Sequence, residues 1–134
     1  MTSPTTTDPA AVLHFWFDEL SATQHFAKDA ALDAAIAQRF GPTLEAAARG
    51  ELSGWRASTP GRLAEIVVLD QFSRNVWRHT PRAFAQDGMA LVLAQELVAS
   101  GQDRALPPTQ RAFAYMPYMH SESAAIHAQS VQLF

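Results

Sequence analysis

The segment LAEIVVLDQFSRNVW, residues 63–77, decides the fold of this chain. It follows Ser58-Thr59-Pro60, where a capping hydroxyl precedes a proline, so the sequence predicts a helix from about residue 60 to Trp77. Apolar side chains leave this helix no wide polar face, which indicates that it is largely buried. Its apolar residues are Leu63, Ile66, Val67, Val68, Leu69, Phe72 and Val76.

Two charged residues lie within this apolar helix. Asp70 and Arg74 are four residues apart on the stripe that begins with Leu63, so they adjoin each other and the core. A buried charge is costly unless it is paired, so both side chains need a partner or a ligand. One interpretation is a structural ion pair between helices. The other is an anion clamp of Arg74 and Asn75, with Asp70 holding the arginine in place.

The rest of the chain predicts further helices. Helical spacing, capping residues and Pro/Gly stops indicate helices over residues 10–20, 28–49, 81–100, 108–119 and 122–134. Gly41-Pro42 should kink or break the helix that contains it, and Pro117 should disturb the end of its own helix. No stretch alternates as a strand requires. We therefore predict an all-α fold of about six helices, arranged as antiparallel hairpins.

The composition is that of one globular domain. The chain has 134 residues, of which 48% are hydrophobic and 17% charged. This length and balance suffice for a single core without disulfide or metal support. We expect residues 1–8 to form a flexible N-terminus and residues 9–134 to form the helical domain.

Charge and residue types narrow the classes of partner. A net charge of -3 with a pI near 5.9 gives no basic surface for nucleic acid, which is not an expected partner. Without cysteine the chain has no disulfide, Cys-bound zinc or thiol chemistry. The N-terminus does not resemble a signal peptide, and no apolar run has the length of a bilayer span. We expect a cytoplasmic protein with no membrane partner.

A second group of polar residues lies at His120-Ser121-Glu122, before the last predicted helix. A helix start offers free amides and a positive dipole, so this turn is a plausible ligand site, and His120 could act as a general base. The simpler interpretation has Ser121 as a cap, Glu122 opposite the dipole and His120 half-buried. Two side chains do not make a zinc site, and the sequence has no phosphate-loop or metalloprotease motif. We predict no metal and no cofactor.

Several ordered motifs resemble the bacterial domain-of-unknown-function family 924, over about residues 12–134. They are VLHFWF (12–17), FAKD (26–29), RFGP (39–42), LDQFSRN (69–75), FAQD (84–87) and YMHSES (118–123). The resemblance implies a helical fold similar to tetratricopeptide-like hairpins, with no established substrate or cofactor. The family's recurring polar positions correspond to Asp70, Gln71, Arg74, Asn75, Asp87, His120 and Glu122, which are the candidate ligand-binding residues.

The sequence departs from the family pattern in two places. Ser73 stands where the family has proline, so we expect a more regular helix there. Family members continue with a further basic, aromatic segment, whereas this sequence stops at Phe134 in a helix with an apolar end. Either Phe134 packs onto the body of the protein, or the domain is incomplete at its C-terminus relative to the family.

Two functions remain open from the sequence. The first is a helical-hairpin scaffold that binds a protein, a peptide or a second copy of itself. The second is a small-molecule enzyme or a binder of an anionic metabolite, with a pocket around Asp70, Arg74, Asn75, His120 and Glu122. A third, purely architectural interpretation makes these residues links between helices. No motif assigns a reaction. The pocket requires that residues 70–75 and the turn at residues 119–122 face a common cavity.

Overall fold

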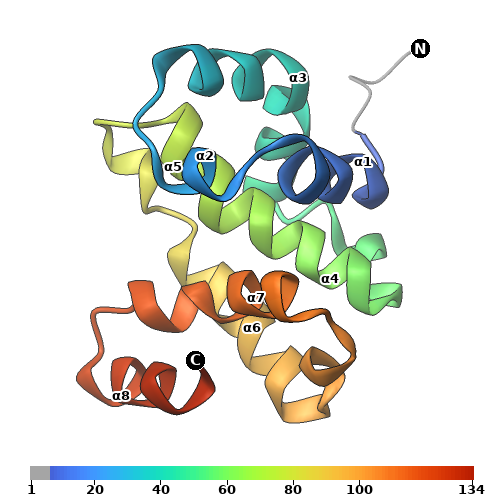
Figure 1. Cartoon of the computed structure of the whole chain (residues 1–134), viewed down its shortest axis with the longest axis vertical. Helices are drawn as coiled ribbons and strands as arrows, with labels where there is room; N and C mark the ends of the chain where they lie inside the picture. Colours follow the sequence, from blue (N-terminus) through green and yellow to red (C-terminus); the bar gives the residue numbers. More distant parts are fainter. Residues whose placement is uncertain (1–6) are drawn as a thin grey trace.

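In the computed structural model, which describes residues 7–134, all the regular elements are helical. This part of the chain contains no strand, which confirms the all-α class. Figure 1 shows one long helical run that crosses the middle of the molecule, with the N-terminal helices on one side and α6–α8 on the other. None of the helices between residues 7 and 134 combines the length and apolar character that a bilayer crossing requires.

The central run corresponds to the helix predicted over residues 60–77. It consists of α4 (Thr59–Ile66), a π-helical turn η3 (Val67–Phe72) and α5 (Ser73–Val76). Ser58 caps it, because its side-chain oxygen accepts a hydrogen bond from the Gly61 amide at 3.0 Å. The expectation that Ser73 makes this helix more regular is wrong, because a π turn directly precedes it. Serine in place of proline removes one cause of a helix kink. A π turn, however, can form without any proline.

The burial of this central run is confirmed. The apolar residues from Leu63 to Phe72 are all fully buried. The Phe72 ring packs against Phe40 at a centroid distance of 5.1 Å and against Trp16 at 5.8 Å. α4 contacts α1 on one side and α6 and α7 on the other, while η3 contacts α3, α6 and α7. The core therefore surrounds the central run, and any polar side chain on it must find a partner inside the protein.

The N-terminal part differs from the prediction in three places. The helix predicted over residues 10–20 is a short α-helix followed by a π-helical stretch. A short helix after Ser21 was not predicted, although Ser21 and Gln24 form a capping box. Of the kink or break predicted at Gly41-Pro42, the break does not occur, since the α-helix continues through Pro42 to Ala48. The elements are α1 (Pro9–Leu13), η1 (His14–Glu19), α2 (Ala22–Phe26), α3 (Ala30–Ala48) and the 3-10 turn η2 (Ser53–Ala57).

The predicted flexible N-terminus falls mainly on residues 1–6, which lie outside the described residues. Thr7 and Asp8 are described. The Thr7 amide donates a hydrogen bond to the Thr43 hydroxyl at 3.1 Å. Asp8 caps α1 by accepting a hydrogen bond from the Ala11 amide at 2.9 Å. These two residues therefore connect the start of α1 to the body of the protein.

In the C-terminal part, the turn that begins at His120 lies next to the central run. The helix predicted from residue 81 begins later, and a 3-10 turn precedes it. Ser123, rather than Ser121, caps the last helix. Phe134 packs edge-on against the Tyr115 ring at 5.7 Å while 55% exposed. The elements are η4 (Pro81–Ala83), α6 (Asp87–Ser100), η5 (Gln102–Ala105), α7 (Pro108–His120) and α8 (Ala124–Leu133).

A buried ion pair fixes the start of the central run. The Glu65 side chain has no exposed surface and accepts two hydrogen bonds from Arg56, from Nε and from Nη2, each at 2.8 Å. This two-point geometry compensates the buried carboxylate and attaches η2 to α4. Donating these hydrogen bonds to Glu65 raises the pKa of Arg56.

Replacing Arg56 with alanine is expected to lower the free energy of unfolding by about 3 kcal/mol or more, because Glu65 would keep a buried charge without a partner. Arg49→Ala is the matched control, since the Arg49–Glu51 pair is exposed on both sides and should contribute almost nothing. Urea denaturation followed by circular dichroism measures both. Equal losses in the two variants would contradict the structural role of the Arg56–Glu65 pair.

Candidate functional site

Asp70 is the centre of the polar network. It lies in the π turn η3 and is fully buried. Its Oδ1 accepts hydrogen bonds from His120 Nδ1 at 2.8 Å and from Arg74 Nη1 at 3.2 Å, and its Oδ2 accepts one from Gln71 Nε2 at 2.8 Å. Three donors around one carboxylate compensate its burial. The network joins the central run to the end of α7.

Arg74 carries this network on to α6. Its Nη1 and Nη2 donate to the two carboxylate oxygens of Asp87 at 2.8 and 2.9 Å, and Nη1 also donates to the main-chain oxygen of Asp70 at 2.8 Å. The guanidinium carbon lies 5.2 Å from the centre of the Phe84 ring. Arg74 is therefore held by two carboxylates and an aromatic face, and most of its donors are already used.

His120 is fixed by only one of its two ring nitrogens. It is the last residue of α7, and its side chain is 25% exposed. A carboxylate only accepts hydrogen bonds, so Nδ1 donates to Asp70. Among the described residues Nε2 has no hydrogen-bond partner. In the neutral ring this arrangement places the lone pair on Nε2, where it can accept a proton or a hydrogen bond.

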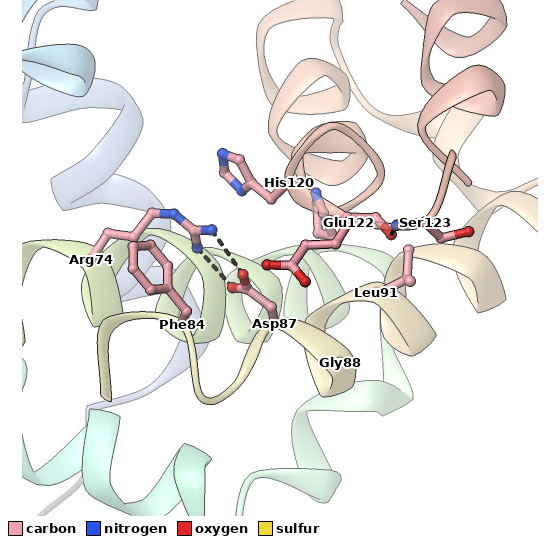
Figure 2. Close-up of a pocket in the computed structure, with 10 residues that line it drawn as sticks. Arg74, Phe84, Asp87, Gly88, Leu91, His120, Glu122 and Ser123 are labelled. Carbon is pink, nitrogen blue, oxygen red and sulfur yellow. Dashed lines mark hydrogen bonds and ion pairs between the residues drawn. The ribbon is translucent and has the colours of Figure 1, made fainter. Parts of the chain in front are cut away.

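A cleft of about 600 Å³ lies between the start of α6 and the turn that joins α7 to α8. Its polar lining includes Asp87, His120 and Glu122, and its apolar lining includes Phe84, Leu91 and Pro117. Figure 2 shows the carboxylates of Asp87 and Glu122 facing the same space, with Arg74 and Phe84 at one end. We call this the acidic cleft, because Asp87 and Glu122, with Asp70 behind His120, outnumber the cation Arg74.

The structure brings five of the seven predicted site residues to this cleft. Arg74, Asp87, His120 and Glu122 line it, and Asp70 lies directly behind His120. Gln71 is buried beside Asp70 and does not reach the cleft. The sequence did not single out the apolar wall of Phe84, Leu91 and Pro117. Phe84 is notable because its side chain is 62% exposed. A sequence pattern does not show that an aromatic residue is exposed.

Asn75 lies elsewhere, so the predicted clamp of Arg74 and Asn75 is wrong. Adjacent residues of a helix point in different directions, and the Asn75 amide donates to Asp33 Oδ1 at 2.8 Å. Arg78 also pairs with Asp33, with 2.8 Å between its Nε and Oδ2. Burial raises the pKa of Asp33, but the hydrogen bonds from Arg78 and Asn75 and the charge of Arg78 outweigh this and hold the pKa below 3.8.

The donor set of the acidic cleft does not form a metal centre. Between residues 7 and 134 no three side chains of His, Asp or Glu lie where they could share one metal ion. Asp87 is engaged by Arg74, and the Nδ1 of His120 by Asp70. The cleft instead offers hydrogen-bond acceptors beside an apolar wall.

Comparison with known proteins gives the family. The family described as "Bacterial protein of unknown function (DUF924)" matches residues 12–134. The chain belongs to this family. A solved structure of a protein of unknown function, ATU0120 from Agrobacterium tumefaciens, is similar, with a TM-score of 0.88 and 36% sequence identity over 93% of this chain and 70% of that chain. No curated protein matches the sequence. These matches establish the family and the fold and assign no reaction.

Asp70→Asn is expected to lower the free energy of unfolding by about 3 kcal/mol or more, because an amide offers only one acceptor atom to three donors and turns its own donor toward them. Asp87→Asn removes a carboxylate that is 28% exposed and should cost about 1 kcal/mol. Chemical denaturation of the two variants side by side makes the comparison. A loss for Asp70→Asn no larger than that for Asp87→Asn would count against the central role of Asp70.

Proposed function

We propose that this protein binds a small, amine-bearing organic molecule in the acidic cleft, with the Asp70–His120 pair as a hydrogen-bond and proton acceptor. The observation that carries the proposal is the fixed imidazole of His120. A fully buried carboxylate holds one ring nitrogen, and the other belongs to a residue that lines a cleft with two further carboxylates. Such a pre-positioned acceptor is a feature of ligand and active sites.

The charge of the cleft favours a cation. Arg74 already donates to Asp70 and Asp87, whereas Glu122 has no ion-pair partner among residues 7–134. The groups that are still free, Glu122 and Nε2 of His120, accept hydrogen bonds. An ammonium group is a donor with a positive charge and suits the Glu122 carboxylate, which faces the cleft. This argues against the anionic metabolite that the sequence suggested for the same residues.

The apolar wall sets the rest of the ligand. Phe84, Leu91 and Pro117 face the cleft beside the carboxylates. An exposed aromatic ring next to acceptors favours a molecule that has an apolar body and a charged end. The same His120 geometry is that of a general base, since Asp70 orients the imidazole and supports its protonated form. Proton removal from the bound molecule is therefore the reaction class that we propose, if the protein is an enzyme.

Titration of the ¹⁵N-labelled chain with benzylamine tests the binding proposal, with benzyl alcohol and benzoate as its uncharged and anionic counterparts. We expect benzylamine alone to shift the amide signals of residues 84–91 and 117–123. Glu122→Gln should weaken its binding several-fold, because one exposed carboxylate partner is lost. Glu51→Gln makes the same change on a remote surface and should have no effect.

Two results would overturn the amine proposal. One is a set of shifts that is the same for all three probes or absent from these residues. The other is binding of benzylamine that Glu122→Gln leaves unchanged.

The scaffold function stays a prediction, as does the cytoplasmic location. One observation bears on self-association, namely that α8 exposes Val131 at 75% and Phe134 at 55%. If α8 mediates self-association, sedimentation velocity should show a species that grows with concentration and disappears in Val131→Ser. A monomer at every concentration would exclude self-association for this chain.

A further inference from the structure

A second cleft, of about 540 Å³, adjoins the acidic cleft, because Arg74 and Phe84 line both. Its charged lining consists of Lys28, Arg74, Arg78 and His79, with no carboxylate. We call it the basic cleft. Figure 2 shows Arg74 and Phe84 together at one end of the acidic cleft.

Two of these four basic groups lack an ion-pair partner among residues 7–134. Arg74 is paired with Asp70 and Asp87, and Arg78 with Asp33, which lies outside the lining of this cleft. Lys28 and His79 make no ion pair among residues 7–134. Asp29 is next to Lys28 in sequence, but it uses Oδ1 to accept hydrogen bonds from the Ala31 and Leu32 amides. Asp29 and Asp33 line a neighbouring cleft with Lys28, Arg78 and His79, whereas the lining of the basic cleft itself contains donors and no carboxylate.

The backbone holds His79 in an uncommon conformation. Its φ is 69°, in the left-handed region that glycine and asparagine adopt more readily than histidine. The neighbouring Thr80 closes the turn, with its amide and its hydroxyl both donating to the Trp77 oxygen at 3.0 and 2.7 Å. A residue that keeps a large imidazole side chain at a position better suited to glycine is a candidate for a functional role.

We propose that the basic cleft binds a small oxyanion, a phosphate or carboxylate group, through Lys28, His79 and the free donors of Arg78. An ammonium, an imidazole and a guanidinium around one space are the donors that proteins use for such groups. Phe84, Pro81 and Ala83 add an apolar side to the cleft, which suits an oxyanion carried on an organic group. This site is separate from the amine site, because the carboxylate of Glu122 lines only the acidic cleft.

The chain offers a direct probe, because Lys28 is its only lysine. Reductive methylation with ¹³C-formaldehyde keeps the positive charge and labels only Lys28 and the N-terminal amine. Titration with phenyl phosphate, benzoate or inorganic phosphate at constant ionic strength should shift the Lys28 signal to saturation, and sodium chloride should not. Comparing the titrations with phenyl phosphate and benzoate shows which oxyanion is preferred. Saturation of the Lys28 shift by either compound supports the site.

His79→Asn provides the decisive variant, since asparagine tolerates the left-handed backbone and removes the imidazole. We expect thermal stability to be kept or raised while oxyanion binding weakens about tenfold, the loss of one charge-assisted hydrogen bond. His127→Asn, on the exposed face of α8, is the matched control and should bind as the parent does.

Two outcomes would overturn the oxyanion site: a response to chloride equal to that to the oxyanions, or unchanged binding in His79→Asn. Glu122→Gln should leave oxyanion binding intact, so that a failure of the amine site and a failure of this site are distinguishable.

Discussion

The carboxylate of Asp70 is the group on which the arrangement of the site depends. It lies without exposed surface in the most apolar helical run of the protein, where an uncompensated charge would be strongly destabilising. His120 from α7 and Arg74 supply donors, and Arg74 in turn holds Asp87 at the start of α6. One requirement, that a buried charge be satisfied, therefore positions the central run, α6 and α7 relative to one another. The acidic cleft is the space that remains between them.

Arg74 lines two clefts whose charged residues differ. Its guanidinium carbon lies 5.2 Å from the centre of the Phe84 ring. Asp87, Glu122 and His120 line the first cleft with it, and Lys28, Arg78 and His79 line the second. Because Arg74 already pairs with two carboxylates, it lines both clefts without a free charge, and the neighbouring side chains determine which ligand binds. Acceptors face the first cleft and donors face the second. On this account, cationic groups bind in the acidic cleft and anionic groups bind in the basic cleft.

The sequence predicts the centre of this arrangement better than its surroundings. The apolar character of residues 63–77 predicts that Asp70 is buried. Helical periodicity predicts that Asp70 pairs with Arg74, which is four residues further along. The partner of Asn75 was not predictable, because Asp33 is 42 residues away in the chain. The same holds for the basic cleft, which combines Lys28 with residues 74–84. Helix α2 could have been predicted from the capping residues Ser21 and Gln24. The continuation of α3 through Pro42 depends on packing, which overrides the tendency of proline to end a helix.

The most direct test of the central claim is the protonation pattern of the His120 ring, read from a long-range ¹H–¹⁵N correlation spectrum at a pH where the ring is neutral. If Asp70 accepts a hydrogen bond from Nδ1, the spectrum will show the tautomer with its proton on Nδ1 and a bare Nε2. In Asp70→Asn this preference should weaken or reverse. A ring in the parent protein that carries its proton on Nε2, or that exchanges freely between the two tautomers, would contradict the account.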